Sequence, residues 1–231
     1  MSGPVYVALD MTDAGEAAAL AKRLRGHVGG VKLGLEFFVA NGPAGIRAVS
    51  DAGLPIFLDL KLHDIPNTVA GAMASAVVLD PAIVTIHAGG GAAMMHAAAE
   101  AARKAKRPPL VIAVTVLTSL DDSDLTSVGQ RPPALEQAVR LAVLAKESGL
   151  GGVVCSPHEV AAIRARCGAD FKLAVPGIRP ASAALGDQKR VMTPAQAVAA
   201  GADHLVIGRP ITQAQDPVSA AQAIAAELRA G

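Results

Sequence analysis

Short apolar segments alternate with longer amphipathic segments along the whole chain. The apolar segments are rich in Val, Leu and Ile, as expected for strands that are buried on both faces of a sheet. They lie at Val5–Leu9, Gly30–Gly34, Pro55–Leu60, Ile83–His87, Leu110–Val116, Gly152–Cys155, Lys172–Val175 and His204–Gly208. We therefore predict eight strands.

The amphipathic segments carry apolar residues at every third or fourth position, which is the pattern of a helix that buries one face. They lie at Ala14–Leu24, Ala44–Ala52, Val69–Val78, Gly91–Lys104, Ala134–Ser148, Pro157–Cys167, Pro194–Ala200 and Val218–Arg229. Asp13 can cap the first helix, and Pro157 and Pro194 suit a first helical turn. Gly149 and Gly201 follow predicted helices as stop signals.

Eight alternations of strand and helix predict a parallel α/β architecture. Periodicity alone does not decide between an open sheet and a closed one. The count of eight favours a (β/α)8 barrel, or TIM barrel, and no GxGxxG follows the first strand to favour a dinucleotide-binding sheet. No linker or repeat divides the chain, so we predict a single domain over residues 1–231.

Composition narrows the function. Apolar residues make up 52% of the chain and aromatic residues 2%, which predicts a large aliphatic core. With 21 basic and 20 acidic residues and no Trp, the chain lacks the basic stripe and stacking platforms of a protein that binds a nucleic acid polymer. The two cysteines match no disulfide or metal pattern, and no segment resembles a signal peptide or a membrane span. We expect a cytoplasmic protein that does not bind a membrane.

Charged residues gather where the predicted strands end, which is where barrel enzymes place their functional groups. Asp10 closes the first strand, Lys32 lies in the second, and Asp59, Lys61 and Asp64 follow at the end of the third. Strand alternation places Asp59 and Lys61 on the same face, and a charge buried there needs a partner. This array fits either a structural ion-pair network or a catalytic site, and the pattern alone does not decide between them.

A second cluster follows the last two strands. Arg179 lies after the seventh strand, and Gly208 and Arg209 end the eighth. The corresponding loops of such barrels frequently bind phosphate, and guanidinium groups match phosphate oxygens. The segment 180–190, which includes Gln188, is a candidate lid. From the residues alone we predict a barrel enzyme that acts on a phosphorylated small molecule.

The string from Asp59 to Thr68, DLKLHDIPNT, resembles the signature of orotidine 5′-monophosphate decarboxylases. A DxKxxD core is shared with a wider group of barrel enzymes, whereas the longer string is more specific. The resemblance covers nearly the whole chain in order. Its other parts are Val7–Asp10, Val31–Gly34, Leu117–Ser119, Pro176–Arg179 and Ile207–Arg209.

The resemblance implies decarboxylation of orotidine 5′-monophosphate to uridine 5′-monophosphate, the last step of de novo pyrimidine synthesis, without a cofactor or a metal. Lys61 would protonate C6 of the pyrimidine as CO2 leaves, with Asp59 against the substrate carboxylate. Lys32 and Asp64 would complete the charged array. Asp64 and Thr68 would reach into the active site of the neighbouring subunit of a homodimer.

The resemblance also assigns the substrate contacts. Asp10, Lys32 and Thr68 would contact ribose hydroxyls, and Thr118 would bind the pyrimidine edge. The 5′-phosphate contacts would come from Gln188, Gly208 and Arg209, with Arg179 supporting closure of the lid.

Two other functions remain open from the sequence. A metal-assisted enzyme acting on a keto-sugar phosphate would need carboxylates such as Asp59 and Glu36 around a divalent ion. A phosphate-ligand binding protein would leave the Lys and Asp array without a purpose. We expect a structural role for His63, which alternation directs away from Lys61, and a role as a small buried hydrophobe for Cys155.

Overall fold

The structure is a computed structural model that describes residues 3–180 and 192–230. Its eight strands form one closed parallel barrel in chain order, and the first strand pairs with the last. The strands are β1 (Val5–Ala8), β2 (Gly30–Leu33), β3 (Ile56–Leu62), β4 (Ile83–His87), β5 (Leu110–Val114), β6 (Gly152–Val154), β7 (Lys172–Val175) and β8 (His204–Ile207). The predicted (β/α)8 barrel is confirmed.

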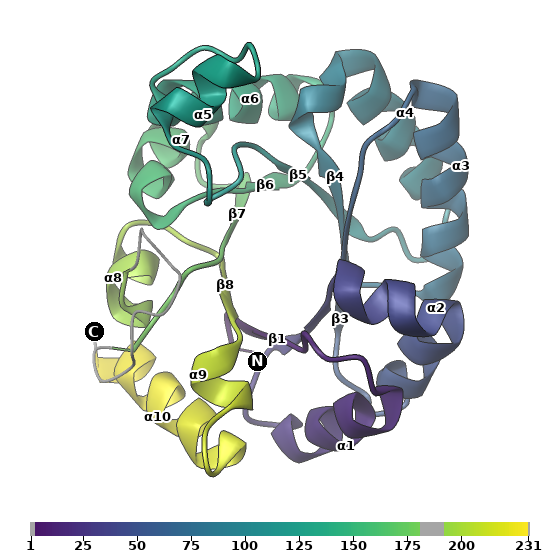
Figure 1. The fold of residues 1–231 in the computed structure, drawn as a ribbon, viewed down its shortest axis with the longest axis vertical. Helices are drawn as coiled ribbons and strands as arrows, with labels where there is room; N and C mark the ends of the chain where they lie inside the picture. The colour runs from purple at the N-terminus through teal and green to yellow at the C-terminus, as the bar shows by residue number, and fades with distance from the viewer. Residues whose placement is uncertain (1–2, 181–191, 231) are drawn as a thin grey trace.

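Helices surround this ring of strands (Figure 1). The main ones are α1 (Ala14–Leu24), α2 (Leu35–Ser50), α3 (Pro66–Ala76), α4 (Gly91–Arg103), α6 (Ala134–Glu147), α7 (Val160–Cys167), α8 (Pro194–Ala199) and α10 (Pro217–Ala230). Short helical segments are η1 (Val77–Leu79), η2 (Ala88–Gly90), α5 (Asp122–Ser127), η3 (Pro157–Glu159) and α9 (Arg209–Thr212). None of the helices described is long and apolar enough to cross a membrane.

Seven of the eight predicted helices are confirmed to within a few residues at each end, but the second is not. We predicted Ala44–Ala52, whereas α2 begins at Leu35. The helix is kinked at Gly42, where φ is +57°, and Pro43 follows. A glycine with positive φ before a proline interrupts the periodic pattern, so the sequence indicated only the second half of the helix.

The short helices α5 and α9 were not predicted because six and four residues are too few to show a period. A signal for α5 was present in the sequence. The side chain of Asp121 accepts the backbone N–H of Asp124, and the side chain of Asp124 accepts that of Asp121, which together form a capping box.

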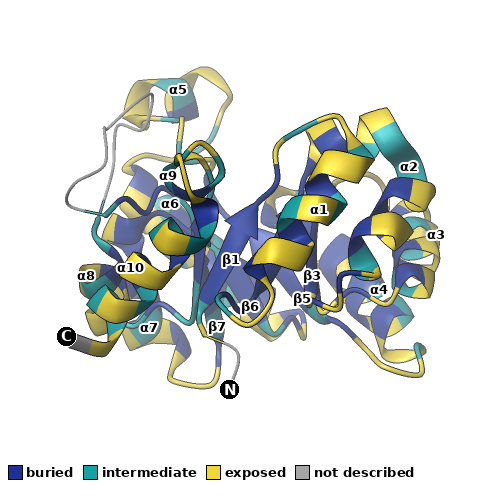
Figure 2. Cartoon of the chain, turned by 90° about the horizontal axis from the view of Figure 1, so that it is seen from below, coloured by how far each residue is buried: buried dark blue, intermediate teal, exposed yellow. Residues whose placement is uncertain are grey.

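The core has two layers, and the buried residues follow the strands and the inner faces of the helices (Figure 2). A large aliphatic cluster includes Val7, Val31 and many helix residues. A smaller cluster contains Tyr6 and Phe57, whose rings meet edge to face with centroids 5.8 Å apart. Phe57 of this smaller cluster also lines the cavity at the carboxyl ends of the strands.

An ion-pair cluster ties α7 to the starts of β7 and β8. Asp203 accepts bonds from the Arg164 guanidinium at 2.6 Å, the Leu173 backbone N–H at 2.9 Å and the Lys172 ammonium at 3.1 Å. Burial alone would raise the pKa of Asp203. The hydrogen bonds from Leu173, Lys172 and Arg164 outweigh burial and hold this pKa below its ordinary value.

We expect Asp203→Asn to lower the free energy of unfolding at neutral pH by about 1–3 kcal/mol, because three partly buried donors lose an ionised acceptor. A carboxyl group with a depressed folded-state pKa stabilises the fold above its unfolded pKa, and this contribution is lost as the pH falls through the folded-state pKa. The difference between Asp203→Asn and the parent should therefore shrink in acid. Urea unfolding at pH 7 and below pH 3.8 tests this, with the exposed Asp51→Asn as control. A difference that is the same at both pH values would contradict it.

Candidate active site

A cavity of about 280 Å³ opens at the carboxyl ends of the strands. Its floor is apolar and includes Phe57, Val154 and Val206. Most of the predicted site residues line it. They are Asp10, Lys32, Asp59, Lys61, Thr118, Arg179, Gly208 and Arg209.

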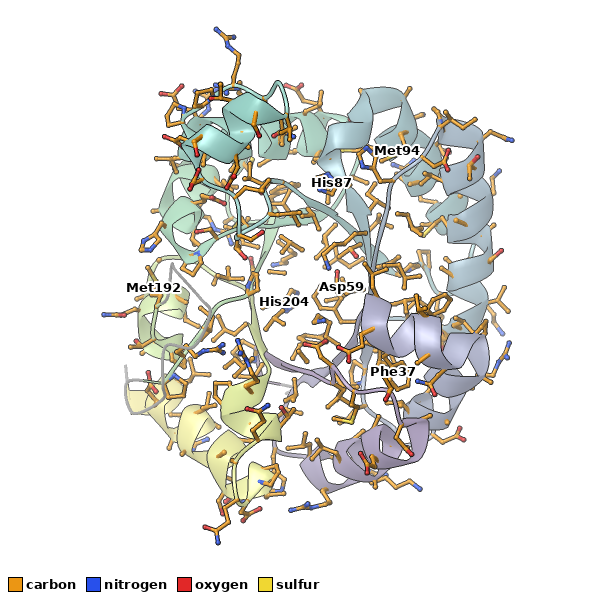
Figure 3. All side chains as sticks on the ribbon, viewed as in Figure 1. Phe37, Asp59, His87, Met94, Met192 and His204 are labelled. Atoms are coloured by element: carbon orange, nitrogen blue, oxygen red, sulfur yellow. The ribbon has the colours of Figure 1, made fainter. Side chains whose placement is uncertain are left out.

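The charged residues on one side of this cavity form a connected row. The Asp59 Oδ2 atom lies 2.8 Å from the Lys61 Nζ atom and 3.3 Å from the Lys32 Nζ atom. The Lys32 Nζ atom lies 3.3 Å from Oδ1 of Asp10. Figure 3 shows Asp59 inside the ring of strands. The row therefore alternates in charge, from Asp10 through Lys32 and Asp59 to Lys61.

Asp59 carries its charge at neutral pH. Burial would raise its pKa, because its side chain is 10% exposed. The charges of Lys32 and Lys61, together with hydrogen bonds from Lys61 and Thr85, hold the pKa of Asp59 below its ordinary value instead. Two ammonium groups thus share one buried carboxylate.

Thr85 was missed by the sequence analysis. Its hydroxyl donates to the Asp59 Oδ1 atom at 2.9 Å and accepts the backbone N–H of Lys61 at 2.9 Å. The signal in the sequence was a hydroxyl residue at the centre of the otherwise apolar segment Ile83–Ile86.

The predicted phosphate-binding residues follow strands that lie away from the Asp59 and Lys61 end of this row. In a closed ring of eight strands, β7 is four strands away from β3, and Arg179 and Arg209 follow β7 and β8. Gly208 approaches β1 so closely that an added Cβ atom would lie 3.4 Å from that of Ala8. Gln188 and the rest of the predicted lid after Pro180 lie outside the described residues.

Similarity to known proteins extends over the whole chain. The model of the orotidine 5′-phosphate decarboxylase / HUMPS family matches residues 3–224. The chain belongs to this family.

Two similar proteins of this family are named orotidine 5′-phosphate decarboxylase. The orotidine 5′-phosphate decarboxylase of Paramagnetospirillum magneticum is 62% identical over 99% of each chain. That of Novosphingobium aromaticivorans is 60% identical over 99% of this chain and 100% of its own. The structure also resembles the crystal structure of orotidine 5′-phosphate decarboxylase from Lactobacillus acidophilus. The two chains share 37% sequence identity, the match covers 99% of each, and the TM-score is 0.86.

Two of the predicted site residues of this family member do not line the cavity. Asp64 is exposed, and its Oδ1 atom accepts the backbone N–H of Ile65 at 2.6 Å. Thr68 is exposed on the first turn of α3. Ile65, which lies between them, is 66% exposed. The segment from Asp64 to Thr68 is therefore exposed and does not line the cavity of its own chain.

His63 and Cys155 are not among the residues that line the cavity. The His63 ring stacks on the ring of His87, with centroids 5.0 Å apart. Burial, followed by the charges of His63 and Lys61, lowers the pKa of His87. Cys155 is fully buried, and burial raises the pKa of its thiol well above the ordinary value. These surroundings agree with the structural roles expected for both residues.

The donor set does not fit the metal-assisted alternative. That alternative places a divalent ion between carboxylates such as Asp59 and Glu36. Glu36 is exposed on α2 and does not line the cavity. The Asp59 oxygen that faces Lys32 and Lys61 is already shared by two cations, which would repel a third.

Proposed function

We propose that the protein removes CO2 from orotidine 5′-monophosphate to give uridine 5′-monophosphate. The observation that supports this most strongly is the row of Lys32, Asp59 and Lys61 in a cavity that two arginines also line, in a chain similar end to end to proteins named for that reaction. The proposal assigns the row to the pyrimidine and the arginines to the phosphate.

The chemistry requires a cation close to C6. When the bond from C6 to the carboxylate breaks, its electron pair remains on C6, and no adjacent group accepts it. The Lys61 ammonium stabilises this negative charge and then transfers a proton to C6, after which water reprotonates the amine. Asp59 holds the Lys61 ammonium in place through the 2.8 Å contact. Lys61 is therefore the general acid of the proposal.

Asp59 has a second role in the proposal. It lies against the substrate carboxylate, and the repulsion between the two anions is relieved as CO2 leaves. We rank this ground-state effect below stabilisation of the carbanion.

The remaining groups bind the parts of the substrate that do not react. Arg179, Gln188, Gly208 and Arg209 take the 5′-phosphate, and the binding energy gained there supports closure over the charged row. Asp10 and Lys32 contact the ribose, and Thr118 contacts the pyrimidine edge. Both cysteines are free thiols, as in a reducing compartment, so we place the reaction in the cytoplasm.

We further propose that the active enzyme is a homodimer in which Asp64 and Thr68 of each subunit complete the site of the other. Support comes from their exposure and from the exposed Ile65 between them. Asp64 would then extend the row of alternating charges beyond Lys61.

Mixing two inactive variants tests the homodimer. Lys61→Ala and Asp64→Ala each disable both sites of a dimer, but a mixed dimer has one site with both native residues. Unfolding and refolding the two variants together should restore about one quarter of the parent activity, because half of the dimers are mixed and each has one working site. Recovery at the level of the separately refolded variants would contradict the shared site.

Substrate turnover in excess chelator tests the function. The purified protein should convert orotidine 5′-monophosphate to uridine 5′-monophosphate, seen as a change in ultraviolet absorbance and confirmed by product chromatography. The metal-assisted alternative instead predicts no conversion of this nucleotide, together with consumption of a keto-sugar phosphate when a divalent ion is added.

A further inference from the structure

The strand that carries the charged row is irregular where the row begins. From Leu58 to Leu62, β3 advances by four residues while its partner β4 advances by two, from Val84 to Ile86. The three intervening residues of β3 therefore stand opposite Thr85. In a regular ladder the backbone groups of β3 that face β4 would bond to its backbone, so here those groups need another partner.

The backbone of Lys61 is strained at this irregularity. Its φ is +51°, in the left-handed region that costs a residue with a side chain about 1 kcal/mol or more. Strain of this kind persists when surrounding contacts hold it. Such a contact here is the hydrogen bond from the Lys61 backbone N–H to Oγ1 of Thr85, 2.9 Å long.

The Thr85 hydroxyl can satisfy two groups in one way only. It accepts from the Lys61 N–H, which is solely a donor, so its own proton is directed to the Asp59 Oδ1 atom at 2.9 Å. The other oxygen of Asp59 takes the two lysine ammonium groups. Thr85 is completely buried, so water does not replace it in either bond. A closed ring results, which runs from the Lys61 backbone through Thr85 and Asp59 to the Lys61 ammonium.

We propose that Thr85 is a positioning residue whose hydroxyl sets the place of the Lys61 ammonium, by fixing the Lys61 backbone and the Asp59 carboxylate together. This inference rests on the proposed function. The position of the Lys61 ammonium then depends on β4 as well as on its own strand, β3. The role requires the hydroxyl and does not require the methyl group of the side chain.

Matched variants separate the hydroxyl from the shape of the side chain. Thr85→Val keeps the shape and removes both hydrogen bonds, whereas Thr85→Ser keeps the hydroxyl. The control is Thr115→Val, since Thr115 is also buried but its hydroxyl donates to the backbone oxygen of Val154, which the Thr115 N–H also reaches.

The expected result is a loss in kcat of about 100-fold for Thr85→Val, the scale of a misplaced reacting group, with Thr85→Ser and Thr115→Val within about threefold of the parent. The dissociation constant for uridine 5′-monophosphate and the KM should stay close to parent values, because the phosphate contacts lie across the barrel. A purely structural role would lower the amount of folded protein and leave kcat per folded molecule unchanged.

Several results would overturn the inference. These are parent-like kcat in folded Thr85→Val, a loss in Thr85→Ser equal to that in Thr85→Val, or a loss confined to KM. If Thr85→Val does not fold, Thr85→Cys replaces it, and a kcat within about threefold of Thr85→Ser would overturn the inference, because a thiol is a weak hydrogen-bonding group. A parent protein that leaves orotidine 5′-monophosphate unchanged would overturn the proposed function as well, whereas an active parent beside an equally active Thr85→Val overturns the inference alone.

Discussion

Lys61→Ala is expected to lower kcat for orotidine 5′-monophosphate by about 10⁴-fold or more, because one side chain supplies both the charge that stabilises the carbanion and the proton that ends it. Removal of either contribution alone costs less. The phosphate contacts are untouched, so binding of uridine 5′-monophosphate should persist. Stopped absorbance assays at saturating substrate measure the change in kcat.

The matched control for this variant is Lys22→Ala, which removes an exposed lysine on α1. It should turn over the nucleotide at the parent rate. A Lys61→Ala variant that binds uridine 5′-monophosphate and retains more than about one hundredth of the parent kcat would contradict the role of Lys61 as general acid, because general acid catalysis contributes at least about 10²-fold.

Asp59→Asn is expected to lower kcat by about 10³-fold without raising KM, again within the range that positioned charges contribute. The amide keeps the shape of the side chain but leaves Lys32 and Lys61 without their shared anion, so that the two ammonium groups repel each other. A substrate carboxylate can then take the place of the missing anion, which favours binding of the substrate and opposes loss of CO2. The steady-state kcat and KM separate these two effects.

Asp170→Asn is the control for this variant, since Asp170 is an exposed carboxylate that does not line the cavity. Its kcat and KM should match those of the parent. If Asp59→Asn raised KM and left kcat unchanged, Asp59 would be a binding residue alone, and the arrangement of two lysines around one reacting centre would need another explanation.

The barrel could be predicted from the sequence because its strands are buried on both faces and its helices on one. The first condition leaves short continuous apolar segments, and the second leaves apolar residues at every third or fourth position. The kink at Gly42 hid half of α2, since it breaks the period without ending the helix. The bounds of strands and helices otherwise differ by one or a few residues, as is usual where ends are set by single hydrogen bonds.

The pairing of Asp59 with Lys61 was predicted for a reason that the structure modifies. Alternation in a regular strand places the two side chains on one face, but β3 is not regular there, because Lys61 has a positive φ. The two groups meet because the Thr85 hydroxyl on β4 accepts the Lys61 backbone N–H and donates to the Asp59 carboxylate. A contact from a neighbouring strand leaves no period in the sequence, so Thr85 was not predicted.

The places of Asp64 and Thr68 depend on more than one chain. Their roles were implied by resemblance, and a single subunit shows only that both are exposed and do not line its own cavity. Gln188 lies outside the described residues, so its predicted contact with the phosphate stays a prediction.

The central claim is that Lys61 delivers a proton to C6 as CO2 leaves. The most direct measurement is turnover of orotidine 5′-monophosphate in deuterium oxide with excess chelator, followed by proton magnetic resonance of the product, for the parent and for Lys61→Ala. The account predicts uridine 5′-monophosphate with deuterium at C6 from the parent and almost no product from the variant. Product formed by Lys61→Ala at the parent rate, or no product from the folded parent, would contradict it.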